Sequence, residues 1–157
     1  MQYRRPGHSD LRVSILGLGA SGLGTRADLS ESQRILDCAW DAGITLIDTA
    51  NFYGRGSSES AIVTWLPQHR SEVIIATKAG LPVGDAAHDR GASRSHLTRE
   101  LEGSLRRLRT DYIDLTCIRC IPSIRGRPSM KRYRPCRPSR NKARCVASEP
   151  PITGPGN

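Results

Sequence analysis

The sequence predicts an α/β fold in which parallel strands alternate with helices. Three observations favour this fold: short apolar runs at residues 45–48 and 73–78 are typical of buried strands, segments with helical apolar spacing separate them, and glycine-rich turns lie between. Parallel strands need long crossover connections, which are right-handed and place helices against the sheet. An open doubly wound sheet and part of a (β/α)8 barrel both fit this order.

The chain begins with a predicted hairpin and a strand. Residues 11–14 alternate apolar and polar side chains, and residues 3–5 are expected to pair with them across a turn at 7–10. The run Ile-Leu-Gly-Leu-Gly at 15–19 is short and apolar, so we expect a buried strand there. The glycines that follow do not form a G-x-G-x-x-G turn leading directly into a helix, which disfavours the doubly wound dinucleotide-binding fold.

Two helices are expected in the next fifty residues. Ser30 and Gln33 have the spacing of a capping box, and Gly43 lies where a C-terminal cap belongs. The apolar face of this first helix has four members: Ile35, Leu36, Ala39 and Trp40. A second helix is expected at about 58–66. Pro67 is expected to stop it, because proline cannot continue a helix.

A third helix and a fourth strand follow the apolar run at 73–78. The apolar stripe of the helix is formed by four leucines at helical spacing: Leu97, Leu101, Leu105 and Leu108. The fourth strand is expected to begin at 112–115.

Charge divides the chain after Leu115. Residues 1–115 carry 14 Lys+Arg and 14 Asp+Glu, whereas residues 116–157 carry 10 and 1, so the whole net charge of +9 lies in this tail. The tail has few apolar residues and strong like charge, and we expect it to be disordered. Because the sequence shows no long apolar run or signal peptide, we expect a cytoplasmic location and no membrane partner.

Asp48 and Lys78 are the residues that most clearly indicate chemistry, because each closes an apolar strand. In a barrel these strand ends meet on one face, and Tyr53 follows Asp48 closely enough to lie on the same rim. An ammonium beside a phenol favours the phenolate and so makes the phenol a better proton donor. We therefore expect Tyr53 to protonate a carbonyl oxygen while Asp48 holds Lys78.

Each of these residues alone has an ordinary structural explanation. An Asp after a strand often caps a helix, a loop Tyr often packs, and a Lys at a rim is often a solvated charge. Their joint occurrence at successive strand ends favours a functional site.

Four motifs in order resemble those of the aldo-keto reductases: LRVSILGLG, DAGITLIDTANFYGRGSSE, VIIATKAG and LEGSLRRLRTDYIDL. The resemblance covers residues 1–115, and this part of the chain is similar to the branch of bacterial reductases and potassium-channel β subunits. It implies the N-terminal half of a (β/α)8 TIM barrel with an N-terminal β-hairpin, an NADPH cofactor and a small carbonyl substrate. It also implies that Asp48, Tyr53 and Lys78 are three members of a catalytic tetrad, and that Ala20, Ser21 and Asp48 contact the cofactor.

The resemblance stops where the family carries its fourth catalytic residue, a histidine on the fourth strand. Arg119 stands at the expected position, and no histidine follows His96. The later strands that bind the cofactor phosphates are missing as well, since a full barrel needs roughly 250 residues. We expect such a half barrel to be inactive and, because its edge strands are unpaired, to aggregate or fold partially.

The tail after Leu115 has three interpretations. Its four cysteines, Cys117, Cys120, Cys136 and Cys145, lack the second close pair typical of a zinc site, and the basic run at 131–134 would bind nucleic acid without specificity. A non-enzymatic zinc- or nucleic-acid-binding protein is therefore the weaker alternative, and a regulatory fragment that pairs with an intact reductase is another.

The third interpretation is a frameshift near Leu115. If each true codon joins the third base of one tail codon to the first two bases of the next, residues 117–121 permit YQVH, 128–132 permit PIDET, and 142–157 permit GKVRCIGASNYRAWQ. These segments resemble the continuation of an aldo-keto reductase and restore the histidine. We therefore expect residues 116–157 to be a non-homologous, frameshifted tail.

Overall fold

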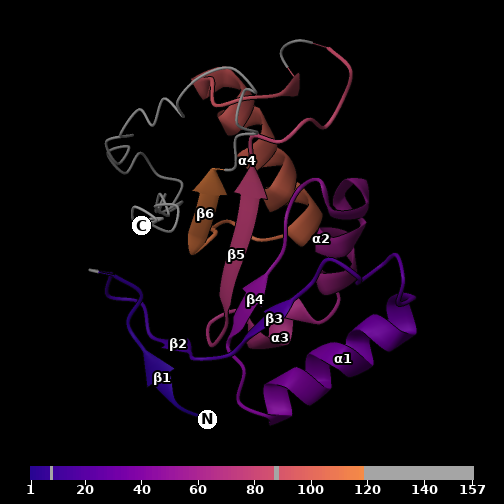
Figure 1. The fold of residues 1–157 in the computed structure, drawn as a ribbon. Helices are drawn as coiled ribbons and strands as arrows, with labels where there is room; N and C mark the ends of the chain where they lie inside the picture. The colour runs from indigo at the N-terminus through magenta and orange to yellow at the C-terminus, as the bar shows by residue number, and fades with distance from the viewer. Residues whose placement is uncertain (8, 87–88, 119–157) are drawn as a thin grey trace, which may run out of the picture.

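The computed structural model of the chain describes residues 1–7, 9–86 and 89–118. Its main sheet has four parallel strands in the order β3-β4-β5-β6: β3 Gly17–Gly19, β4 Leu46–Asp48, β5 Ile74–Ala79 and β6 Leu115–Ile118. Helices α1, α2 and α4 lie on one face of this sheet (Figure 1). A doubly wound sheet carries helices on both faces, so the described part has the arrangement of an opened barrel.

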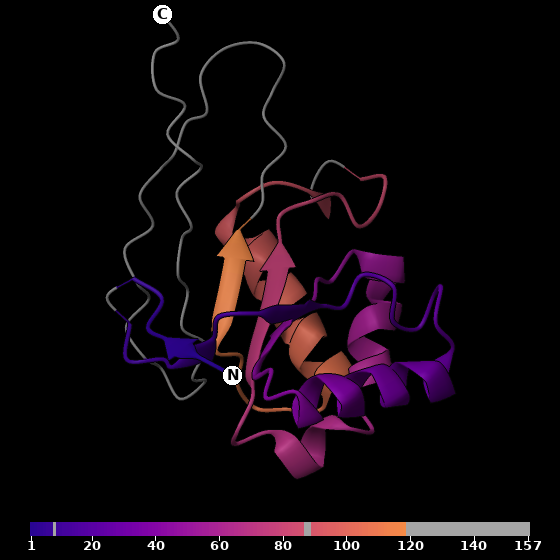
Figure 2. The same ribbon diagram turned by 60° about the horizontal axis from the view of Figure 1, so that its bottom comes forward.

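The predicted hairpin is confirmed. Strands β1 Tyr3–Arg4 and β2 Val13–Ser14 pair antiparallel, and they lie beside the N-terminal ends of the parallel strands (Figures 1 and 2). Ser14 ties the hairpin to the sheet, because its N–H donates to Thr45 Oγ1 at 3.1 Å and its Oγ accepts from Thr45 N at 3.0 Å.

The expectation that residues 15–19 form a buried strand was wrong in one respect. Only Gly17–Gly19 form β3, and Ile15 and Leu16 are 45% and 58% exposed. Within the described residues β3 pairs with β4 alone, so its other edge is unpaired, and Gly17 and Gly19 are exposed. Leu18 is the residue that turns toward the helices and packs on the core.

Helix α1, Leu29–Asp41, begins earlier than the capping-box spacing predicts. Asp28 is the N-cap, with an extended backbone and Oδ1 accepting from Glu31 N at 2.8 Å, so Ser30 already lies inside the helix. The C-terminal prediction is confirmed, since Gly43 has φ +79° and its N–H donates to Trp40 O at 2.7 Å.

Replacing Asp28 by alanine is expected to lower the free energy of unfolding of the chain by about 1 kcal/mol, because it removes the N-cap acceptor. Urea unfolding followed by circular dichroism measures this change. Asp28→Ser supplies another capping oxygen and should retain most of the stability. Equal losses in the two variants would contradict the assignment of the cap.

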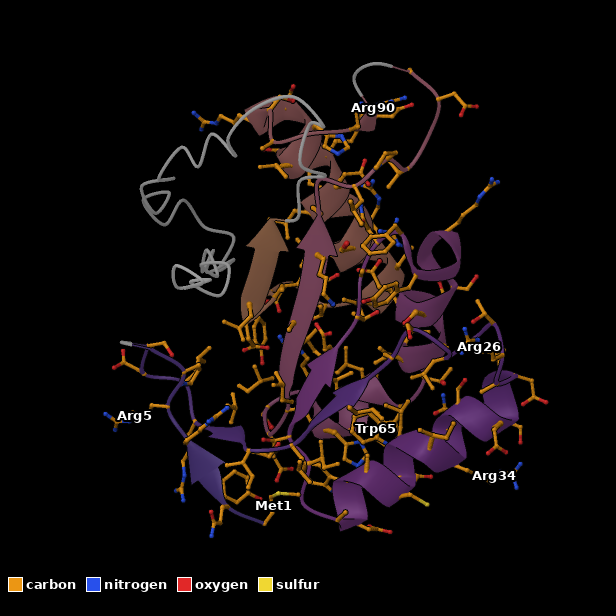
Figure 3. All side chains as sticks on the ribbon, viewed as in Figure 1. Met1, Arg5, Arg26, Arg34, Trp65 and Arg90 are labelled. Atoms are coloured by element: carbon orange, nitrogen blue, oxygen red, sulfur yellow. The ribbon has the colours of Figure 1, made fainter. Side chains whose placement is uncertain are left out.

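The second predicted helix is divided into two. Helix α2 spans Ser57–Ile62 and a short α3 spans Leu66–His69. The prediction that Pro67 stops this helix was wrong. Pro67 lies in the first turn of α3, where a missing N–H costs nothing. Between the two helices, Trp65 is buried beside α1 and its Nε1 donates to Asp37 Oδ1 at 2.8 Å, whereas Arg34 points from α1 into solvent (Figure 3).

Helix α4, Arg94–Leu108, confirms the leucine stripe and adds polar members to it. Leu108 is buried and the other three leucines are partly buried, but three residues without a large apolar side chain are buried on α4 too: His96, Gly103 and Ser104. Strand β6 begins at Leu115, later than the predicted start at 112, and runs three residues past the predicted end of the barrel part.

The core lies between the sheet and the helices. Its fully enclosed side chains include Leu36, Ile47, Ile62, Ile75 and Ile113. In the part of the chain that the structure describes, no helix has the length and apolar character to cross a membrane. The tail residues singled out above, Arg119 and the cysteines from Cys120 onward, lie outside the described residues.

Candidate active site

The carboxyl ends of β4 and β5 bring the predicted residues together. The strands are neighbours in register, with Asp48 opposite Ala76, so the side chains of Asp48 and Lys78 project from the same face of the sheet. Lys78 Nζ donates to Asp48 Oδ1 at 2.6 Å, to Thr49 O at 3.1 Å and to Tyr53 Oη at 3.2 Å. These three bonds use all three donors of the ammonium group.

Burial differs among the three side chains in a way that suits proton donation. The Lys78 side chain is 10% exposed, whereas that of Asp48 is 42% exposed and Tyr53 is half-buried. An enclosed ammonium needs a counter-charge, which Asp48 supplies. Because Tyr53 Oη accepts from Lys78, its own hydrogen is left to donate to a bound molecule.

A turn of unusual backbone conformation holds Tyr53. The residue opens a short helix, η1 Tyr53–Gly56, in which Gly54, Arg55 and Gly56 have φ of 55°, 54° and 93°. A Cβ at Gly54 would collide with the side chain of Thr25, so glycine is required there for space as well as for conformation. The Phe52 ring packs edge-on against Tyr53 with centroids 4.7 Å apart and limits its movement.

The three predicted cofactor residues, Ala20, Ser21 and Asp48, differ in their exposure to solvent. Ala20 is fully buried, its N–H donates to Asp48 O at 2.9 Å, and its carbonyl accepts from Ser58 Oγ at 2.7 Å. Ser21 is exposed beside it. In this arrangement Ser21 and Asp48 can touch a bound molecule, and Ala20 lies buried behind them. The cofactor contacts of all three residues stay predictions.

An open cavity of about 520 Å³ lies beside the turn that carries Tyr53. Phe52 and Arg55 line it from this turn, Pro82 and Val83 from the loop after β5, and Glu100 from α4. Its lining thus combines apolar and charged groups, as is common where a small molecule binds, but Asp48, Tyr53 and Lys78 are not among its lining residues.

Sequence reasoning missed the polar residues behind the site. Thr49, Ser58, Glu59 and Thr77 are all buried, and Glu59 is an enclosed carboxylate. The only sequence signal is a serine and an acid at the start of a helix, which usually indicates a solvated cap. Among residues 1–7, 9–86 and 89–118, no three His, Cys, Asp or Glu side chains gather into a metal site.

Comparison with known proteins identifies relatives of this arrangement. The model of the Aldo/keto reductase family matches residues 15–124. An uncharacterized oxidoreductase of Bacillus subtilis, YrpG, is 43% identical over 126 residues, and a probable voltage-gated potassium channel subunit beta of Oryza sativa subsp. japonica is 38% identical over 119. Each alignment covers 73% of this chain and, respectively, 39% and 36% of the relative.

A solved structure shows the same fold. The aldo-keto reductase AKR11C1 from Bacillus halodurans, in a holo form, superposes with a TM-score of 0.68 and 37% sequence identity over 75% of this chain and 40% of its own. The chain thus spans about two fifths of the length of the relatives it matches. None of these matches supports a zinc- or nucleic-acid-binding protein.

Proposed function

We propose, from the premise that this chain belongs to the aldo/keto reductase family, that residues 1–118 carry the proton-donating part of an NADPH-dependent aldehyde or ketone reductase. The observation that carries the proposal is the three-way contact of Lys78 Nζ with Asp48, Thr49 and Tyr53. Such a cluster at the carboxyl ends of barrel strands is typical of a catalytic site.

Reduction of a carbonyl group adds a hydride to carbon and a proton to oxygen. A bound nicotinamide cofactor supplies the hydride. Tyr53 donates its phenolic proton to the carbonyl oxygen, and the ammonium of Lys78, 3.2 Å away, stabilises the phenolate that is left. Asp48 holds that ammonium in place and balances its charge.

The residues present fit one end of this cofactor. Ser21 follows the end of β3 and Asp48 ends β4, and we assign the nicotinamide to this pair of strand ends. The bond from Ala20 N–H to Asp48 O joins the two ends. We assign the substrate carbonyl to the position beside Tyr53 Oη, where it can accept the phenolic proton. Groups that would bind the cofactor phosphates are expected from later strands of the barrel.

We also propose that residues 116–157 are read in a shifted frame, and that the true frame encodes the missing histidine and the next strand. The support is the recovery of YQVH, PIDET and GKVRCIGASNYRAWQ from separated stretches of one shift. The nucleotide sequence after the Leu115 codon tests this proposal: absence of any frame that continues the barrel would refute it.

A polypeptide of these 157 residues is expected to show no measurable NADPH-dependent reduction of 4-nitrobenzaldehyde, because Arg119 stands where the family has its histidine. Loss of absorbance at 340 nm measures the reaction. A Tyr53→Phe variant of the same polypeptide is the control for contaminating enzymes. Activity that disappears in this variant would contradict the prediction.

A further inference from the structure

The first turn of α2 places two buried polar side chains behind the candidate active site. Ser58 and Glu59 are both 0% exposed, and their side chains bond to Ala20, Thr49, Thr77 and Arg107 rather than to Asp48, Tyr53 or Lys78. Helix α2 packs on α1 and α4 and lies over the helix-facing side of the sheet (Figure 1). Any effect of these two side chains on the site is therefore transmitted through the strands that lie between.

Ser58 joins the ends of β3 and β4. Its Oγ donates to Ala20 O at 2.7 Å and lies 2.8 Å from Thr49 Oγ1, which must then be the donor in that pair because Ser58 has one hydroxyl hydrogen. The carbonyl of Thr49 accepts from Lys78 Nζ at 3.1 Å. Thr49 is thus held by Ser58 on one side and holds Lys78 on the other.

Glu59 reaches β5 in the same manner. Its Oε1 accepts from Thr77 Oγ1 at 2.7 Å, and Thr77 directly precedes Lys78. Successive side chains of a strand point to opposite faces, so a bond that fixes Thr77 on the helix side fixes the backbone from which Lys78 projects on the site side. Its Oε2 accepts from Arg107 Nε of α4 at 2.6 Å.

The chain makes room for this ion pair at two glycines. A Cβ at Gly56 would lie 2.6 Å from Arg107 Cδ, and a Cβ at Gly103 would lie 3.0 Å from Arg107 Nη1. The Arg107 side chain, 30% exposed, passes between them to reach an enclosed carboxylate. Enclosing a charge is costly, and an apolar pair of similar volume often stabilises a fold equally well, so stability alone is a weak reason for this arrangement.

We propose that Glu59, supported by Arg107, is a positioning residue that sets the location of Lys78 through Thr77. The proposal rests on the proposed function, in which the Lys78 ammonium must lie beside Tyr53 to stabilise the phenolate. Ser58 performs the same task from β4 through Thr49. Together they hold three successive strand ends, those of β3, β4 and β5, in one spatial relation.

Lys78 offers a direct probe, since it is the only lysine before Lys131. The rate at which N-hydroxysuccinimidyl acetate acetylates Lys78 in the complete 157-residue chain can be followed by mass spectrometry of its peptide and compared with the urea-denatured chain. We expect Thr77→Val, which removes the Glu59 contact and keeps the side-chain shape, to raise the rate about threefold to tenfold. Glu59→Leu should raise it at least as much.

Leu36→Ala is the matched control, because Leu36 is 1% exposed in the core on α1 and takes no part in the hydrogen-bonded cluster. It should lower the free energy of unfolding, measured in urea, and leave the acetylation rate of Lys78 unchanged. If the acetylation rate simply follows stability across the three variants, the proposal is wrong. Lys78 that reacts in the unmodified chain as fast as in urea would also overturn it.

The readout needs no turnover. Absence of reductase activity in a chain whose reading frame is restored after Leu115 would refute the proposed function while leaving the acetylation result intact. Unchanged acetylation in Thr77→Val and Glu59→Leu would refute the positioning role alone.

Discussion

Replacing Tyr53 by phenylalanine in a chain whose reading frame is restored after Leu115 is expected to lower kcat for aldehyde reduction by roughly 10²–10⁴, the contribution of a positioned proton donor. The phenol is the only group in the described part of the site whose hydrogen is free while its oxygen contacts the Lys78 ammonium. Phenylalanine retains the ring that packs on Phe52 and removes only the donor. Steady-state NADPH oxidation at saturating aldehyde measures the effect.

Tyr112→Phe in the same restored chain is the matched control. Its hydroxyl donates to Arg70 O at 3.2 Å, far along the sheet from the candidate site, so kcat should be unchanged. Equal kcat values for Tyr53→Phe and the parent would rule out Tyr53 as the proton donor.

Arg70→Met is expected to lower the free energy of unfolding of the 157-residue chain by about 3–5 kcal/mol, because it leaves the carboxylate of Asp114 buried without its counter-charge. The two side chains are each 12% exposed and lie 2.9 Å apart. Arg70 also donates to Val73 O and Tyr112 O, and its guanidinium stacks 3.5 Å from the centroid of the Tyr112 ring. One side chain thus joins the starts of β5 and β6.

Arg34→Met is the comparison variant for this prediction. Arg34 pairs with Glu31 on the surface of α1, where the two side chains are 71% and 45% exposed. An exposed i,i+3 pair contributes only about 0.2–0.5 kcal/mol. Urea unfolding of the two variants measures the difference. Similar decreases in the free energy of unfolding would show that the Arg70–Asp114 ion pair contributes no more to stability than an exposed pair.

The sequence was sufficient for the fold class because the signals were periodic and local. Apolar runs located β4 and β5 within a residue or two, and the leucine stripe located α4. It failed where the outcome depended on neighbours. Residues 15–19 looked like a buried strand by composition, but only 17–19 form the edge strand β3, and Ile15 and Leu16 are exposed. Pro67 looked like a stop signal, but an intervening break allowed it to begin a new helix.

The sequence likewise predicted some residues of the candidate site and missed others. Asp48, Tyr53 and Lys78 were found because charged groups after apolar strands are unusual, and the structure brings all three into hydrogen-bond contact. Glu59 was not found, since only the packing of α2 against β5 and α4 shows that its carboxylate is enclosed. Burial of a polar residue is a tertiary property that neither spacing nor composition reports.

The most direct test of the account is carbonyl reduction by the restored chain, in which residues 1–115 continue into the frame that encodes YQVH and GKVRCIGASNYRAWQ and then through the remaining strands of the barrel. The account predicts NADPH oxidation with 4-nitrobenzaldehyde, balanced by formation of the alcohol and lost in Tyr53→Phe. A restored chain that folds cooperatively and binds NADPH, yet oxidises none of it with a panel of aldehydes and ketones, would contradict the assignment of a carbonyl reductase.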